Sequence, residues 1–139
     1  MSLYVLDTDT FQLFQDDHPL VIAHVQAVAP DDRAISVITV EEQLSGWYAQ
    51  LRQAKQPERL LWAYRRLAAT ARFLSRVQII DFDEAAFQHY EALKTSKVKI
   101  STNDLRIAAT VLARNAILVT RNLRDFQQVP GLRIEDWSK

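Results

Sequence analysis

The sequence predicts an α/β domain in which helices cover both faces of a mostly parallel sheet. Short apolar runs of four or five residues alternate with longer segments in which apolar residues recur at helical spacing. Strands that alternate with helices in this way pair in parallel and are covered on both faces. The 139 residues amount to one domain's length, and no linker, repeat or composition shift divides them. We therefore expect residues 1–139 to form a single domain.

Five short runs have the length of strands, and the first, residues 3–6, has the composition of a strand that is buried on both faces. Each is bounded by polar or turn-forming residues, such as Asp7 after the first run and the segment 31–33 before the second. The five expected strands are residues 3–6, 34–38, 77–80, 116–120 and 132–135.

Helices are expected between these strands. Pro57 stands where a first helical turn tolerates proline, Asp83 is a typical N-cap, and Thr102–Asn103 could cap the helix that follows. The expected helices are residues 19–28, a segment from residue 40 onward, and residues 57–76, 83–93 and 104–115.

A helical hairpin is expected at about residues 43–75, where two amphipathic segments follow each other directly. Trp47 and Tyr48 lie on the apolar stripe of its first helix, and Leu61 and Tyr64 lie on that of the second. Such stripes usually pack into the core, so we expect Trp47 and Tyr48 to be buried, whereas the amphipathic pattern of the hairpin as a whole suits a partner contact and plain packing equally.

The composition excludes several classes of protein. Lys and Arg number 17 and so do Asp and Glu, so the chain is not globally basic, although a local basic patch is compatible with this balance. The absence of cysteine excludes disulfides, thiolate metal sites and thiol nucleophiles. No apolar run approaches the roughly 20 residues of a membrane span, and residues 1–4 open into a strand-like segment instead of a basic signal sequence. We expect a cytoplasmic protein without a membrane partner.

Five acidic residues stand at the ends of the expected elements. Asp7 and Asp9 follow the first strand, Glu42 begins the helix after the second strand, Asp104 begins another helix, and Asp125 follows the fourth strand. A parallel sheet would bring these positions to one edge, where ligands of such sheets gather.

Carboxylates that crowd together repel one another, and a divalent cation removes this repulsion. Ligand sets made only of oxygen favour Mg²⁺ or Mn²⁺. The chemistry expected from such a site is hydrolysis of a phosphodiester by metal-activated water.

Each acid also has a structural explanation. Asp7 could cap a short helix, and acids in a first helical turn such as Asp104 favour the helix dipole. Asp125 could form an exposed ion pair with Arg121 or Arg124, which would add little stability. The shared location of the acids favours the functional interpretation.

The chain resembles the PIN-domain ribonucleases, and specifically the VapC-type toxins of bacterial toxin–antitoxin pairs. The resemblance follows the family's order over nearly the whole chain. The segments that carry it are LDTDT at 6–10, ISVITVEEQLSG at 35–46, NDLRIAATVLARNAILVTRNLRDF at 103–126 and VPGLRIEDW at 129–137.

The resemblance assigns the metal-binding, catalytic acids residue by residue. Asp7 matches the family's first acid, Glu42 matches the second because it stands three positions after Thr39 in the IT-x-x-E pattern, and Asp104 matches the third.

The fourth acidic position is open between two residues. Asn122 stands where many relatives have aspartate, and we assign Asp125, three residues later, as the fourth acid with Asn122 in support. Asp9 occupies a position often held by asparagine and is a further supporting candidate, and Thr120 is expected to orient a carboxylate or a bound water.

The resemblance implies a three-layer α/β/α fold with about five strands and an endoribonuclease that depends on Mg²⁺ or Mn²⁺. It also implies a homodimer, a VapB-type antitoxin as partner, with the hairpin at 43–75 in contact with the antitoxin or the second copy, and transfer or ribosomal RNA as substrate. Cations near the acids would position this RNA through its phosphates, and the candidates are Lys97, Lys99, Arg121 and Arg124.

Two other functions compete with this interpretation. The segment Asp7–Thr10 also fits the nucleophile motif of haloacid-dehalogenase-type phosphatases, with Asp7 as nucleophile. That family requires a later Gly-Asp acidic motif, and neither Gly46 nor Gly131 precedes an aspartate. The second alternative is a PIN-like domain that binds RNA or a partner while its acids are idle.

Overall fold

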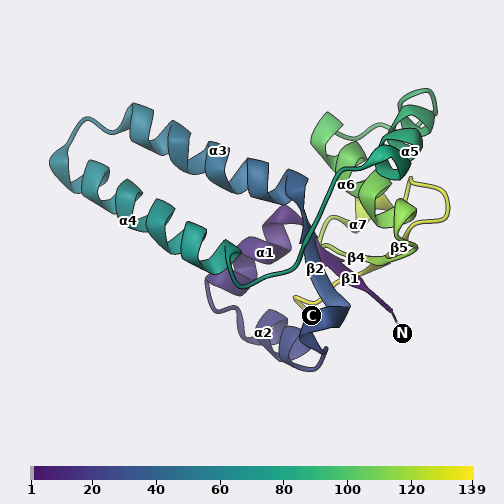
Figure 1. Cartoon of the computed structure of the whole chain (residues 1–139), viewed down its shortest axis with the longest axis horizontal. Helices are drawn as coiled ribbons and strands as arrows, with labels where there is room; N and C mark the ends of the chain where they lie inside the picture. The colour runs from purple at the N-terminus through teal and green to yellow at the C-terminus, as the bar shows by residue number, and fades with distance from the viewer. Residues whose placement is uncertain (1) are drawn as a thin grey trace.

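A computed structural model describes residues 2–139. Five strands form one sheet in the order β3-β2-β1-β4-β5, and every neighbouring pair is parallel (Figure 1). The expectation of a mostly parallel sheet with about five strands is therefore confirmed. The strands are β1 (Tyr4–Leu6), β2 (Arg33–Ser36), β3 (Ile79–Ile80), β4 (Ile117–Val119) and β5 (Arg133–Glu135).

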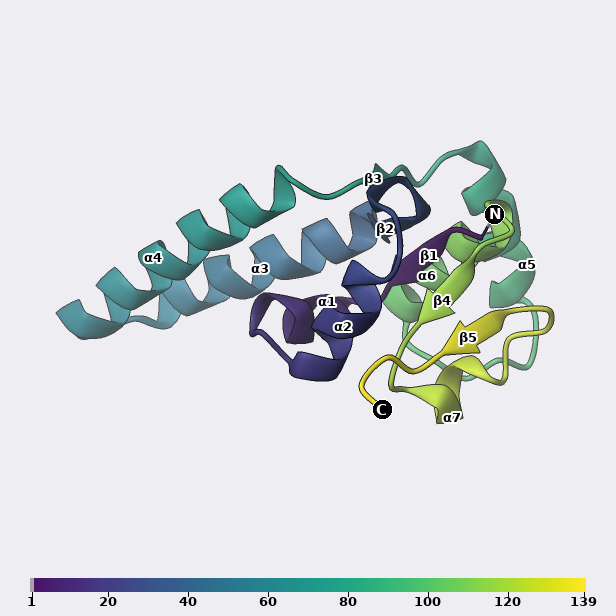
Figure 2. The same cartoon turned by 90° about the horizontal axis from the view of Figure 1, so that it is seen from below.

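Helices complete three layers around this sheet. The pair α5 and α6 lies on one side of the strands and the pair α1 and α2 on the other, while α3 and α4 run out together as a long hairpin (Figures 1 and 2). In residues 2–139, no helix is long and apolar enough to cross a membrane. The helices are α1 (Thr8–Gln15), α2 (Pro19–Gln26), a 3₁₀ helix (Pro30–Asp32), α3 (Val37–Gln53), α4 (Pro57–Leu74), α5 (Glu84–Lys94), α6 (Thr102–Ala113) and α7 (Leu123–Phe126).

Two apolar clusters, one on each face of the sheet, form the core. Val5 of β1 packs into the cluster with α5 and α6, whereas the next residue, Leu6, packs into the cluster with α1 and α2. Leu118 and Val119 of β4 divide between the clusters in the same way. Successive side chains of a strand point to opposite faces, so the central strands β1 and β4, which are covered on both faces, are apolar at every position.

Several predicted boundaries are wrong: the strand expected at 77–80 begins at Ile79, the helix expected at 19–28 ends at Gln26, and two further errors involve a serine cap. The strand expected at 34–38 ends at Ser36, because the Ser36 hydroxyl accepts from the Thr39 amide at 3.3 Å and α3 begins at Val37. Ser101, not Thr102–Asn103, caps α6 by accepting from the Asp104 amide at 3.1 Å. Apolar β-branched residues at the start of α3 had extended the strand pattern.

Of two short helices beside site residues, α1 was expected only as the alternative explanation of Asp7, and α7 was not predicted. Helix α1 begins directly after Asp7, which caps it, and α7 begins directly after Asn122, which caps it in the same way. These residues were identified as site residues, and they also begin helices.

The apolar stripe of the hairpin is largely exposed, so the expectation that Tyr48 is buried is wrong. Tyr48 is 47% exposed, Leu61 58% and Tyr64 55%. Trp47 is half-buried and packs edge-on against Trp62 of α4, with ring centroids 5.3 Å apart. Helices α3 and α4 therefore pack mainly on each other and leave an apolar surface of the hairpin uncovered by the described chain.

Candidate active site

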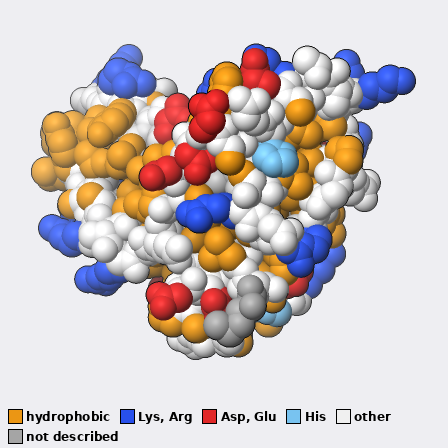
Figure 3. Space-filling view, turned by 45° about the vertical axis from the view of Figure 1, so that its right-hand side comes forward, with side chains coloured by type: hydrophobic (Ala, Val, Ile, Leu, Met, Phe, Trp, Pro, Cys, Tyr) orange, Lys and Arg blue, Asp and Glu red, His pale blue; other side chains and the backbone are white. Residues whose placement is uncertain are grey.

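A cavity of about 520 Å³ opens at the carboxyl ends of β1 and β4. The chain crosses from β1 to β2 on one side and reaches β4 on the other, so the cavity lies where the strand order reverses, which is the usual ligand site of such sheets. Four of the predicted acids and Asn122 contribute to its lining, and Figure 3 shows Asp and Glu side chains gathered on one face. The four lining acids are Asp7, Asp9, Glu42 and Asp104.

Asp7 is the most deeply buried of these acids. It follows β1, its amide donates to the Val119 carbonyl at 3.0 Å, and its Oδ1 accepts from the Thr10 amide at 2.9 Å. Burial raises the pKa of Asp7 above its ordinary value, and hydrogen bonds from Thr120 and Thr10 only partly oppose this effect. The charged form of Asp7 is therefore costly in the protein alone.

Glu42 is held in one orientation by side chains from two other helices. The Thr8 hydroxyl of α1 donates to Oε1 at 2.5 Å, and the Asn103 amide of α6 lies 3.4 Å from Oε2. The Thr8 and Thr39 hydroxyls are 3.0 Å apart. The roles of Thr8 and Asn103 were missed by the sequence analysis, although each is adjacent in sequence to a predicted acid.

Asp104 shows that the acids share one electrostatic site. It lies half-buried in the first turn of α6, and burial is the main cause of its raised pKa. The negative charges of Glu42, Asp7 and Asp125 raise that pKa further. Glu42, Asp7 and Asp125 are therefore close enough to Asp104 to disfavour its charged form.

Asn122 and Asp125, the two candidates for the fourth acidic position, are in contact, and only Asn122 lines the cavity. Asn122 lines the cavity, and its Nδ2 donates to Oδ2 of Asp125 at 2.9 Å. Its backbone amide donates to the Thr120 hydroxyl at 2.9 Å, which joins this turn to the end of β4. Asp125 therefore reaches the cavity through Asn122.

Asp9 is engaged by a cation at the rim of the cavity. Arg121 Nε and Nη2 donate to the two Asp9 oxygens at 2.8 and 3.3 Å. The suggested ion pair between Asp125 and Arg121 or Arg124 is not formed within the described residues, because Arg121 pairs with Asp9 and Arg124 has no acidic partner there.

The remaining predicted RNA-binding residues lie on the surface. Lys97 and Lys99 belong to the loop that leads into α6, and both are exposed, as is Arg124. None of these three forms an ion pair with another described residue. Their charges are available to an anionic ligand.

The donors in the cavity are oxygen and amide groups. Among residues 2–139, no three His, Cys, Asp or Glu side chains are close enough to form a ready-made metal site. Mg²⁺ characteristically keeps several of its waters, so a hydrated ion fits carboxylates that line a cavity without touching one another. Histidine chemistry is not indicated, because His18 caps α2 and His24 stacks on Trp137.

The comparisons with known proteins agree with this geometry. Residues 4–132 match the PIN domain family. The chain belongs to this family. It is similar to the tRNA(fMet)-specific endonuclease VapC of Salmonella typhimurium, with 30% identity over 99% of both chains. It is also similar to ribonuclease VapC2 of Haemophilus influenzae, with 32% identity over 99% of both chains.

Solved structures place the chain in the same group of PIN domains. One of these structures is the VapBC2 complex from Rickettsia felis bound to a DNA fragment from its promoter. A chain of this complex superimposes with a TM-score of 0.79 and 29% identity, over 97% of the present chain and 98% of its own length. The three-layer fold and the VapC-type resemblance are thereby confirmed. The phosphatase interpretation has no support in the family match.

Proposed function

We propose that this VapC-type PIN domain is an endoribonuclease that depends on a divalent metal and acts as the toxin of a toxin–antitoxin pair. The observation that carries the proposal is the convergence of Asp7, Glu42 and Asp104 on one cavity of a chain with full-length similarity to ribonucleases. Its substrate is structured RNA in the cytoplasm. Transfer RNA is favoured over ribosomal RNA by the name of the Salmonella relative.

The residues that would hold Mg²⁺ or Mn²⁺ are Asp7, Glu42 and Asp104, with Asp125 acting through Asn122. When bound, the metal supplies a Lewis acid that lowers the pKa of water and neutralises charge on the phosphate. The raised pKa values of Asp7 and Asp104 support this assignment, because a nearby cation stabilises their charged forms.

The chain's own residues orient the acids and the RNA. Hydrogen bonds from Thr8 and Asn103 hold the Glu42 carboxylate in the lining of the cavity. A hydrogen bond from Thr120 favours the charged form of Asp7. Arg121 lies at the rim, where it can contact a phosphate next to the bond that is cut. Because water attacks in place of the ribose 2′-hydroxyl, the products carry 5′-phosphate and 3′-hydroxyl ends.

The exposed hairpin is the surface that we assign to protein partners. Leu61, Tyr64 and Ala68 line a shallow hollow on α4, and Arg65 and Arg72 flank it without an acidic partner in the described chain. An apolar surface with unpaired cations fits an amphipathic, acidic segment. A VapB-type antitoxin provides this segment in our proposal, and the uncovered remainder of the hairpin supports a homodimer.

The proposal is tested by incubating the pure protein with bulk transfer RNA and MnCl₂, with and without EDTA, and sequencing the ends of the fragments. We expect cleavage that needs Mn²⁺ and is lost in Asp7→Asn. A wild type that binds RNA but cuts none with Mn²⁺ or Mg²⁺ would support the idle PIN domain instead. Hydrolysis of p-nitrophenyl phosphate without RNA cleavage would favour the phosphatase.

A further inference from the structure

Gln43 is a buried amide beside the catalytic cavity that the proposed mechanism does not use. It follows Glu42 on α3, is only 7% exposed and contributes to the cavity lining. Its Nε2 donates to Oε1 of Gln12 at 3.0 Å, and its Oε1 accepts from Nε2 of Gln15 at 2.8 Å. Both partners belong to α1, so three side-chain amides join α1 to α3.

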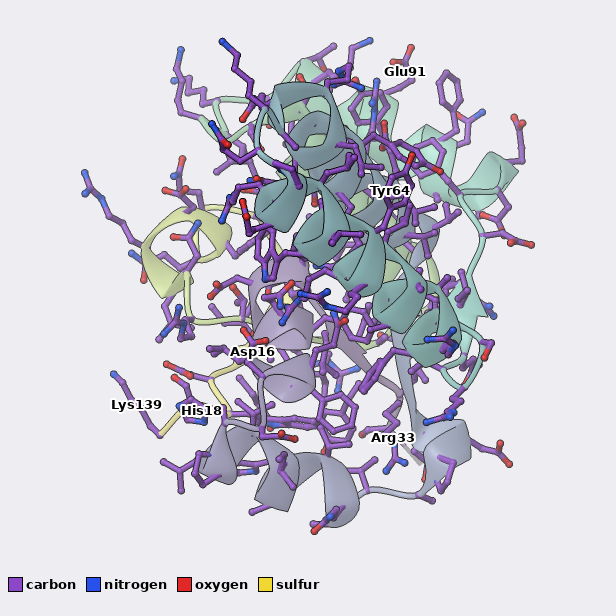
Figure 4. The ribbon with its side chains drawn as sticks, turned by 90° about the vertical axis from the view of Figure 1, so that its left-hand side faces the viewer. Asp16, His18, Arg33, Tyr64, Glu91 and Lys139 are labelled. Carbon is purple, nitrogen blue, oxygen red and sulfur yellow. The ribbon has the colours of Figure 1, made fainter. Side chains whose placement is uncertain are left out.

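A single carboxylate fixes the direction of this amide ladder, which consists of Gln12, Gln43 and Gln15. Gln12 Nε2 donates to Oδ1 of Asp16 at 3.1 Å, and an ionised carboxylate can only accept. Gln12 must therefore turn its oxygen toward Gln43, which in turn directs its own oxygen toward Gln15. Figure 4 shows Asp16 near the end of α1, where Arg66 of α4 reaches it at 3.5 Å.

The ladder is the second of two polar ties between α1 and α3. The first joins Thr8 to Thr39 and Glu42. Thr8, Gln12 and Gln15 are spaced four and three residues apart, so they lie on one face of α1. A buried amide costs free energy unless its hydrogen bonds are made. The contact between α1 and α3 therefore has one favourable register, and sliding of the two helices would break these hydrogen bonds.

We infer that Gln43 is a positioning residue, and that the amide ladder oriented by Asp16 keeps Glu42 of α3 in register with Asp7 at the start of α1. Glu42 lies in α3, whereas Asp7 follows β1 and caps α1, so their relative placement depends in part on how α1 packs against α3. This inference rests on the proposed function, because the register matters only if both acids hold the same ion.

The test compares Gln43→Leu with Gln88→Leu by calorimetric titration with MnCl₂ in the absence of RNA. Gln88 donates to Glu84 on the exposed surface of α5, so its substitution also removes an amide hydrogen bond but lies outside the site. We expect Gln43→Leu to bind Mn²⁺ about tenfold more weakly and Gln88→Leu to match the wild type. In cleavage of transfer RNA, kcat should fall similarly while KM for the RNA stays within about twofold.

Asp16→Asn provides a variant whose folding is not at risk, because the Asp16 side chain is 49% exposed. An asparagine can donate as well as accept, so the ladder loses its fixed direction. We expect an intermediate loss of about threefold in Mn²⁺ affinity, less than the roughly tenfold cost of an outer-shell change.

Several outcomes would overturn the inference. Equal Mn²⁺ affinity and kcat in the wild type, Gln43→Leu and Asp16→Asn would overturn the positioning role and leave the proposed function standing, even if Gln43→Leu has a lower Tm. If Gln43→Leu does not fold, an unchanged Asp16→Asn would overturn it. A wild type that neither binds Mn²⁺ nor cleaves RNA would overturn both proposals.

Discussion

The catalytic cavity and the α3–α4 hairpin depart from ordinary packing in opposite ways. The cavity buries carboxyl groups whose charged forms are disfavoured, whereas the hairpin exposes apolar side chains such as Leu61 and Tyr64. Each arrangement costs stability in the isolated chain, and each is relieved by a different kind of ligand. A cation stabilises the acids and a protein surface covers the hairpin, because anything that binds only the folded state stabilises it. The comparison implies that substitutions in the two regions have separable effects.

The largest effect is expected for Asp7→Asn. Because an outer-shell change costs about 10–100-fold, loss of a carboxylate that holds the metal should lower cleavage by more than about 100-fold. Asparagine caps helices as well as aspartate does and carries no charge, so α1 should persist and the Tm in EDTA should rise. Fragment analysis on gels and thermal melting measure the two quantities. Full cleavage by this variant would remove Asp7 from the site.

The hairpin should show the opposite pattern. Tyr64→Ala removes an exposed aromatic ring of the kind that anchors interfaces, so affinity for a cognate VapB-type antitoxin should fall by about 2 kcal/mol, or roughly 30-fold. Cleavage of RNA by the purified toxin should stay within about twofold. Surface plasmon resonance and sedimentation velocity measure binding and self-association, with Phe87→Ala on exposed α5 as the matched control. Unchanged binding and an unchanged oligomer would contradict the assignment of this surface.

A smaller effect within the cavity is expected for Asp125→Asn. Asp125 touches the site through Asn122, so its loss should lower cleavage by about tenfold, as for a group outside the direct ligands. Asn122→Ala should cost at least as much, because Asn122 itself lines the cavity. Rates of RNA cleavage at saturating MnCl₂ show which of the two substitutions costs more activity. If Asp125→Asn were as inactive as Asp7→Asn, Asp125 would be a direct ligand.

Arg121→Gln should mainly alter RNA binding. Loss of one phosphate contact lowers the slope of log K against log salt by about 0.7 for single-stranded RNA. Arg114→Gln, an exposed change at the far end of α6, is the control. Fluorescence anisotropy in increasing KCl measures both slopes. Equal slopes in wild type and Arg121→Gln would contradict this prediction, because they would show that Arg121 stays paired with Asp9 and makes no phosphate contact.

The acids of the cavity should give the stability of the chain a modest pH dependence, which can be assigned to the cavity by substituting Asp7. An acid with a raised pKa in the folded state binds more protons there than in the unfolded state, so its contribution to stability is lost as pH rises through that pKa. In EDTA, the contribution of Asp7 and Asp104 should therefore fall from acidic toward neutral pH. Asp7→Asn should flatten this part of the curve of Tm against pH, and an identical curve would contradict it.

Much of the fold and most of the acidic site could be predicted from local sequence features. Short runs rich in apolar residues identified the strands, and acids at element ends identified Asp7, Glu42 and Asp104. Helix α1 was expected only as an alternative to the site role of Asp7, and in the structure Asp7 both caps this helix and lines the cavity. The pair of Arg121 and Asp9 joins residues 112 positions apart, and no local pattern reports such a contact.

The hairpin marks a different limit of sequence analysis. Helical spacing of apolar residues shows that α4 has an apolar face, but it does not specify what covers that face. The sequence therefore predicted the helix correctly but left open whether Leu61 and Tyr64 are covered, and the structure leaves them exposed.

The most direct test of the central claim is the position of a bound cation. Crystals of the protein soaked in MnCl₂ should give an anomalous scattering peak in the cavity among Asp7, Glu42 and Asp104, and crystals of Asp7→Asn should lose it. Saturated crystals with no peak in this cavity, or with the same peak in both proteins, would contradict the claim that these acids form a metal-dependent catalytic site.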